Sequence, residues 1–121
     1  MTMEAGVVVD VRGRALFWHV PPGRTSGSLP DSRDLWEVFW HKRSCLFGFA
    51  HTHPGKGMPF PSNTDLTTFE AVEKALGRTL SWWVVSEDRV ALCVKRDDKW
   101  TVEEVEQDLE WLDELRRVSY R

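Results

Sequence analysis

The chain has 121 residues, of which 41% are hydrophobic and 29% are charged, and its formal net charge at pH 7 is −3. These values are typical of a single soluble domain that covers residues 1–121. The slightly acidic balance argues against a nucleic-acid-binding protein, whose surface usually carries a basic surplus, and no apolar stretch is long enough for a membrane span.

The N-terminal part of the chain indicates a β-hairpin followed by a long loop. Residues 7–11 and 15–20 are rich in β-branched and aromatic side chains, and Arg12-Gly13-Arg14 between them is typical of a turn. Residues 21–30 are rich in Pro, Gly and Ser. We expect a loop there, and we expect it to run near a cleft.

A helix and a buried strand are expected next. Asp31 or Ser32 can cap a helix that extends to about residue 43. The segment 46–50 is short, apolar and rich in aromatics, which is typical of a buried strand. The strand is expected to end at Pro54, since proline cannot donate a hydrogen bond to a neighbouring strand.

The second half of the chain predicts a helix, two strands and a long C-terminal helix. The first helix covers residues 65–76, and the strands cover 79–85 and 90–94. Apolar residues at helical spacing then predict one helix over 102–118, with a buried stripe of Val102, Val105, Leu109, Leu112 and Leu115. The order ββαβαββα indicates an α/β (α+β-like) domain, in which helices flank a mixed sheet.

The cysteines and the N-terminus indicate the cellular compartment. Cys45 and Cys93 each lie in or beside an apolar strand, and we expect both to be reduced core residues. The N-terminal residues include Glu4 and Asp10 and lack a basic, apolar leader. We therefore expect a cytoplasmic protein.

One stretch of the chain places zinc-binding side chains at a spacing that can bring them together. His51 and His53 are two residues apart at the end of the expected strand, so their imidazoles point the same way. The chain must then loop back, and Asp65 comes in the first turn of the next helix. Two histidines and one carboxylate make three corners of a tetrahedron and leave the fourth for water, which is the layout of a catalytic zinc site.

Each of these residues also has a simpler explanation. A His-x-His pair can be two polar residues at the rim of a cleft, and Asp65 can complement the helix dipole. Ser62 can cap the helix, three residues ahead of Asp65. These explanations account for each residue separately. They leave unexplained why all four residues share one strand–loop–helix junction.

The order His51-x-His53-Pro54-x7-Ser62-x2-Asp65 resembles the signature of the JAMM (MPN+, JAB-domain) zinc metalloproteases at all five defined positions. The likeness is to a small bacterial-type member and extends more weakly over most of the chain. It implies a single JAMM/MPN-like domain over residues 1–121, with a curved mixed sheet and a cytidine-deaminase-like layering of helices.

The resemblance also implies a role for each motif residue. His51, His53 and Asp65 would hold one Zn²⁺ per chain. Ser62 would help to stabilise the oxyanion of the tetrahedral intermediate.

The family further needs a glutamate ahead of the histidines as general base, and both Glu4 and Glu37 precede them. We expect Glu4, because it stands just before a β-rich run and resembles the family's Glu-x-x-Gly pattern, although it is one residue closer to the glycine. Glu37 lies in the expected helix outside the sheet, which is a poor place from which to reach the metal.

The substrate that the resemblance implies is a peptide or isopeptide bond at the C-terminal tail of ubiquitin or of a ubiquitin-like or sulfur-carrier protein. Two other functions stay open. One is a zinc-binding but catalytically inactive MPN module that serves as a scaffold. The other is a different zinc hydrolase, which ranks low because only His19 and His41 remain as further histidine ligands and both precede the motif.

Overall fold

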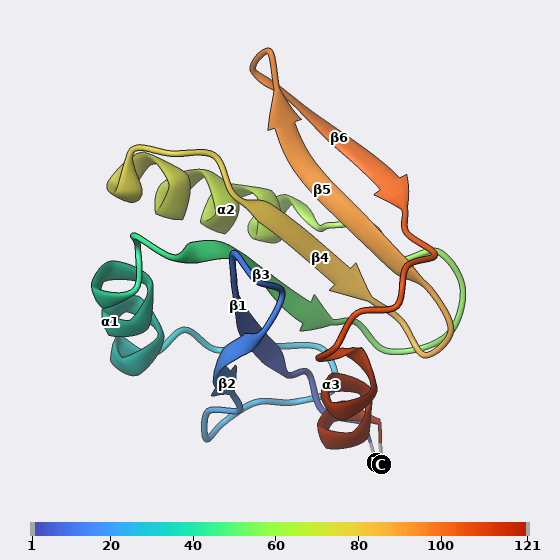
Figure 1. Cartoon of the computed structure of the whole chain (residues 1–121). Helices are drawn as coiled ribbons and strands as arrows, with labels where there is room; N and C mark the ends of the chain where they lie inside the picture. The colour runs from blue at the N-terminus through green and yellow to red at the C-terminus, as the bar shows by residue number, and fades with distance from the viewer. Residues whose placement is uncertain (1, 121) are drawn as a thin grey trace.

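The computed structural model describes residues 2–120, in which six strands form one mixed sheet with helices on both faces (Figure 1). The elements, in chain order, are β1 (Gly6–Asp10), β2 (Ala15–His19), α1 (Arg33–His41), β3 (Leu46–Thr52), α2 (Asn63–Leu76), β4 (Ser81–Val85), β5 (Val90–Arg96), β6 (Lys99–Glu104) and α3 (Leu112–Ser119). The strand order is β2-β1-β3-β4-β5-β6. β3 and β4 pair in parallel, and the other neighbours pair antiparallel. The expected mixed sheet flanked by helices is therefore confirmed.

Alternation of side chains along the strands divides the apolar residues between the two faces of the sheet. On β4, Trp82 packs in a buried cluster with Phe39 of α1 and Phe69 of α2. The next residue, Trp83, points to the opposite face and packs in a second cluster with Leu115 of α3. The domain thus has one core under α1 and α2 and another under α3 (Figure 1).

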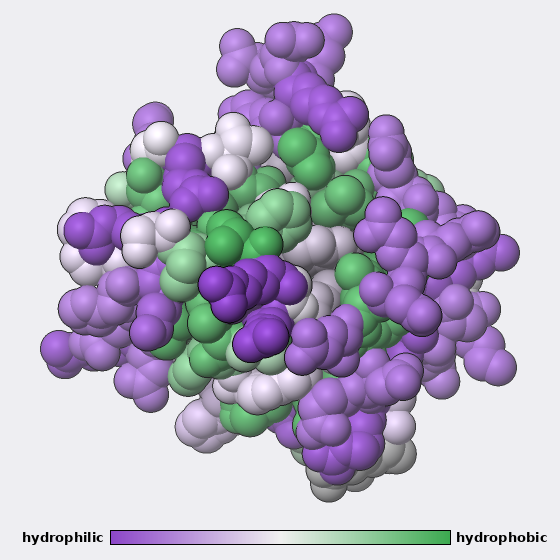
Figure 2. All heavy atoms as spheres, viewed as in Figure 1, coloured by the Kyte–Doolittle hydropathy of each residue, from purple (hydrophilic) through white to green (hydrophobic). Residues whose placement is uncertain are grey.

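The core under α3 is only partly shielded from solvent. α3 has eight residues. Leu92 of β5 and Val105, which directly follows β6, pack against this core and are only partly buried. Hydrophobic side chains accordingly gather near the middle of the face shown in Figure 2, and hydrophilic ones surround them. Among the helices of residues 2–120, none could span a membrane.

The long helix expected over 102–118 is wrong in its first half. Residues 99–104 form β6, and the helix begins only at Leu112. The apolar stripe at helical spacing predicted a helix here, but Trp100 and Val102 also fit the two-residue period of a strand.

A two-residue turn explains why a strand forms there. Arg96 pairs with Lys99, so Asp97 and Asp98 alone connect β5 to β6. Both aspartates have positive φ, 50° and 63°, as a type I′ hairpin turn requires. Aspartate tolerates this conformation better than most residues. The observed order is therefore ββαβαβββα.

The ends of α2 follow the local sequence signals. Ser62 caps its N-terminus, and Gly77 ends the helix with a φ of 67°. Trp40, in contrast to the buried Leu35 and Phe39 of the same helix, is 51% exposed. It lies near the end of α1, where the Arg43 guanidinium stacks on its ring.

Gly48 permits the close pairing of β3 with β4. A Cβ at this position would lie 1.8 Å from the carbonyl oxygen of Ser81, which is its partner in the parallel register. Because that oxygen belongs to the backbone, no side-chain rotation relieves the clash. We expect Gly48→Ala to lower the free energy of unfolding by about 2–3 kcal/mol in urea denaturation. Gly27→Ala, where a Cβ meets nothing within 4 Å, should change it by less than about 0.5 kcal/mol.

Candidate metal centre

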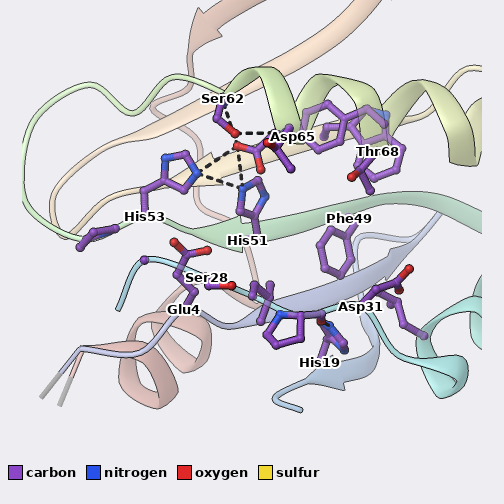
Figure 3. Close-up of a pocket in the computed structure, with 18 of the residues that line it drawn as sticks. Glu4, His19, Ser28, Asp31, Phe49, His51, His53, Ser62, Asp65 and Thr68 are labelled. Atoms are coloured by element: carbon purple, nitrogen blue, oxygen red, sulfur yellow. Dashed lines mark hydrogen bonds and ion pairs between the residues drawn. The ribbon is translucent and has the colours of Figure 1, made fainter. Parts of the chain in front are cut away.

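The end of β3 places both motif histidines on the face that α1 and α2 cover. His51 follows Phe49 by two residues, and the two rings stack with their centroids 6.4 Å apart. His53 lies just beyond the strand, where its backbone N–H donates to the carbonyl of Val85 at 2.8 Å. The two imidazoles therefore point the same way, toward the N-terminus of α2 (Figure 3). The alternation expected from the sequence is what brings them together.

Asp65 reaches the histidines because α2 begins beside the end of β3. It is the third residue of the helix and forms a capping box with Ser62. The Ser62 hydroxyl accepts from the Asp65 backbone N–H at 3.0 Å, and Asp65 Oδ2 accepts from the Ser62 backbone N–H at 2.9 Å. Oδ2 also lies 3.1 Å from His53 Nε2 and 3.3 Å from His51 Nε2. Ser62 and Asp65 therefore do cap the helix, as the simpler explanation requires. The same cap holds the Asp65 carboxylate beside the two imidazoles.

The distances within this group fit a single small cation. His51 Nε2 and His53 Nε2 are 3.1 Å apart, so the separations among the three candidate ligand atoms run from 3.1 to 3.3 Å. Tetrahedral ligands at about 2.0–2.1 Å from a zinc-sized ion lie about 3.3–3.4 Å from one another. His51, His53 and Asp65 could therefore hold a metal ion with little rearrangement.

Charges within the group favour the ligand form of the carboxyl. Burial by itself would raise the pKa of Asp65, but hydrogen bonds with His51 and His53 and the Ser62 N–H hold it well below its ordinary value. The hydrogen bond with Asp65 raises the pKa of His53, although burial acts in the opposite direction. Asp65 is thus a carboxylate at neutral pH, the state in which it can bind a cation.

Glu4 faces this group from the segment just before β1. Gly6 pairs with His51 in the sheet, so the residues just before β1 lie beside the end of β3. Figure 3 shows the Glu4 carboxylate directed toward the two imidazoles. Its backbone N–H donates to the Thr25 carbonyl at 2.8 Å, and the residue is only 8% exposed. Glu4 is therefore an anchored residue of the site.

The surroundings of Glu4 also change its acidity. Burial raises the pKa of Glu4 above its ordinary value, and the charge of Asp65 acts in the same direction, while the charges of His51 and His53 oppose them. A carboxylate with a raised pKa is a better proton acceptor near neutral pH. Glu37, the other candidate base, is exposed on α1 and forms an ion pair with Arg33 at 3.0 Å. The structure thus brings Glu4, and not Glu37, to the histidines.

The group opens into a cavity of about 700 Å³. The expected loop over 21–30 borders it, as predicted, through residues 27–30. Sequence reasoning did not identify the aromatic wall formed by Phe49 of β3 and Phe69 of α2. The positions of the two phenylalanines could have indicated this wall. Phe49 stands two residues before His51, and Phe69 stands four residues after Asp65. Those spacings place each ring beside a candidate ligand.

Tyr120 supports the end of β3 and was also missed by the sequence reasoning. Its single hydroxyl proton is shared between the carbonyl oxygens of His53, at 2.6 Å, and Val85, at 2.8 Å. We expect Tyr120→Phe to lower the free energy of unfolding by about 1–2 kcal/mol, because a part-buried hydrogen bond is lost. It should also weaken metal binding, since the His53 backbone loses a support. Denaturation and metal titration measure the two effects. Thr67→Val, which removes an exposed hydroxyl that donates to Asn63, should change neither.

Comparison of the chain with protein-family models and with curated protein sequences finds no match. A functional assignment therefore depends on the residues and the geometry of the site.

Proposed function

We propose that this chain is a JAMM-type zinc metallopeptidase that hydrolyses a peptide or isopeptide bond at the C-terminal tail of ubiquitin or a ubiquitin-like or sulfur-carrier protein. The observation that carries the proposal is the mutual approach of His51, His53 and Asp65 at ligand separations, with Glu4 facing them. Two imidazoles and one carboxylate suit zinc, and a set of three protein ligands is typical of its catalytic sites.

Two broader features support the same proposal. The mixed sheet with α1 and α2 on one face and α3 on the other is compatible with the MPN-type layering that the motif implies. Cys45 and Cys93 are both free, as in the reducing cytoplasm that we propose as its compartment.

The roles of the residues follow from their positions. When bound, zinc supplies a Lewis acid that lowers the pKa of water to about 7 and polarises the scissile carbonyl. Glu4 takes the proton of the attacking water at its carboxylate and delivers it to the leaving amine. The Ser62 oxygen accepts from the Asp65 N–H, so its own hydroxyl proton remains to donate to the developing oxyanion. Such a donor contributes about 3 kcal/mol when it is well placed.

Metal content tests the first requirement of the proposal. Protein purified without chelator should contain about one zinc per chain, as a site with three protein ligands implies. The variant His51→Ala/His53→Ala should contain none. His41→Ala is the matched control, because His41 is exposed at the end of α1 and should not affect the zinc content. Elemental analysis measures the metal, and circular dichroism verifies that each variant is folded. A folded wild-type protein without zinc would refute the proposal.

Cleavage tests the second requirement. Fusions of ubiquitin or a ubiquitin-like protein to a short C-terminal extension should be cut by the zinc-loaded protein. Chelation should stop the reaction, and added zinc should restore it. Bound zinc without cleavage of any such fusion would instead favour the inactive scaffold.

A further inference from the structure

The cavity extends well beyond the candidate metal ligands. Its volume of about 700 Å³ lies within the range of small-molecule sites. A water molecule takes up only about 30 Å³, so an ion and an attacking water need a small part of this space. The remainder runs along Phe49 to His19 and Asp31, at the end opposite His53 (Figure 3). Space for a further group is therefore available next to the site of reaction.

The floor of this second part is aromatic and already packed. The Phe49 ring stands between His51 and His19, with centroid distances of 6.4 and 6.2 Å. Phe69 and Trp82 stack behind it, with their centroids 4.3 Å apart. These three aromatic rings are at most 7% exposed and are held by the core, so they cannot turn to fill the cavity.

Gly6 keeps the Phe49 ring in this place. It pairs with both His19 and His51 across the sheet and has no side chain between them. A Cβ on Gly6 would lie 2.3 Å from the far end of the Phe49 ring. The ring therefore occupies the space that a side chain at residue 6 would take. It forms a fixed part of the cavity floor between His51 and His19.

The rim of the cavity is also held in position. The loop over residues 25–31 is fixed at one end where the Glu4 N–H donates to the Thr25 carbonyl at 2.8 Å. Near its other end, His19 Nε2 lies 2.7 Å from the Pro30 carbonyl oxygen, to which it donates. Leu29 and Pro30 thus stand over the aromatic floor as a fixed apolar rim. A site fixed on both sides loses little conformational entropy when it binds a ligand.

Apart from the histidines, the charged side chains that line the cavity are acidic. Glu4, Asp31 and Asp65 border it, and none of the lysines and arginines between residues 2 and 120 lies among its lining residues. An acidic side chain entering the end of the cavity beside Asp31, away from the candidate metal ligands, would meet a carboxylate and no lysine or arginine.

We propose that this part of the cavity is a specificity pocket for a large apolar side chain, aliphatic or aromatic, on the substrate residue that adjoins the scissile bond. The inference rests on the proposed peptidase function and names the substrate feature that the same site selects. Burial of a leucine or phenylalanine side chain against such walls favours cleavage on the order of 10–100-fold in kcat/KM over glycine. A substrate with glutamate at this position is cleaved less efficiently than one with leucine or phenylalanine.

Thr68 offers a way to fill the pocket without touching the metal ligands. It is exposed on α2 and lines the same cavity as Phe49 (Figure 3). Thr67 is equally exposed on the same helix but borders a different depression, on the other side of α2. Thr68→Trp should therefore obstruct the pocket, and Thr67→Trp is its matched control. Both variants should keep their zinc.

The cleavage experiment varies the residue on each side of the scissile bond in turn among Gly, Leu, Phe and Glu. Wild type and Thr67→Trp should prefer Leu or Phe at one of the two positions. Thr68→Trp should lose that preference, by about 10-fold or more, and keep its rate on the glycine substrate. Equal rates for Gly, Leu and Phe in wild type would overturn the pocket.

A binding measurement on zinc-free protein separates this inference from the proposed activity. Acetyl-phenylalaninamide should shift the NMR signals of the Leu29 and Leu35 methyl groups in wild type and in Thr67→Trp, and not in Thr68→Trp. Acetyl-glycinamide should shift them in none. Binding that follows this pattern without any cleavage would retain the pocket and refute the peptidase. Cleavage with no such binding and no side-chain preference would retain the peptidase and refute the pocket.

Discussion

Replacement of Glu4 by glutamine is expected to lower kcat by about 10²–10⁴-fold, which is the usual contribution of a general acid–base. Glutamine has nearly the same shape but cannot accept the proton of the attacking water. Zinc content and KM should stay close to wild type, because Glu4 faces the metal group but is not one of its candidate ligands. Steady-state kinetics on a cleavable fusion measure kcat and KM, and elemental analysis measures the zinc content.

Glu37→Gln provides the matched control for this prediction. Glu37 is the other glutamate ahead of the histidines, and its exposed ion pair with Arg33 lies outside the cavity. The Glu37→Gln variant should have the same kcat as the wild type. An active Glu4→Gln enzyme would show that another group is the base. Wild-type protein with bound zinc and no turnover would mean that the site binds metal without catalysis.

Replacement of Trp82 by alanine is expected to lower the free energy of unfolding by about 3–5 kcal/mol, the cost of removing a large aromatic side chain from a core. Trp82 is 1% exposed, stacks on Phe69 at 4.3 Å and meets Phe39 edge-on at 6.4 Å. Its indole N–H also donates to the buried carboxylate of Glu73 at 2.9 Å. The loss is a large share of the about 5–15 kcal/mol that stabilises a typical domain.

Urea denaturation followed by circular dichroism measures this effect. Trp82→Phe should fall between wild type and Trp82→Ala, because it keeps part of the packing but leaves Glu73 with the Leu80 N–H as its remaining donor. Trp40→Ala should cost less than about 1 kcal/mol, since that ring is half exposed and its contact with the Arg43 guanidinium lies at the surface. Similar losses for Trp82→Ala and Trp40→Ala would contradict the placement of Trp82 at the centre of the core.

The candidate metal ligands could be found from the sequence because their arrangement follows local rules. Side chains two apart on a strand share a face, so His51 and His53 had to be neighbours once residues 46–52 formed a strand. Asp65 was placed by the capping signal at Ser62, which sets where α2 begins. The sequence did not predict β6, because a stripe of apolar residues at helical spacing concealed the two-residue turn at Asp97 and Asp98.

Local sequence signals were thus enough to identify His51, His53 and Asp65 and the strand and helix that carry them. The sequence also favoured Glu4 over Glu37, and the pairing of β1 with β3 places Glu4 where it faces this set. Two features became visible only in the folded protein. Tyr120 supports the end of β3, and Phe49 forms the floor of the cavity between His51 and His19. The difference between the two groups of features lies in the distance along the chain. Caps, turns and side-chain alternation act over a few residues, whereas these contacts arise only when β1 pairs with β3 and the C-terminus returns to the sheet.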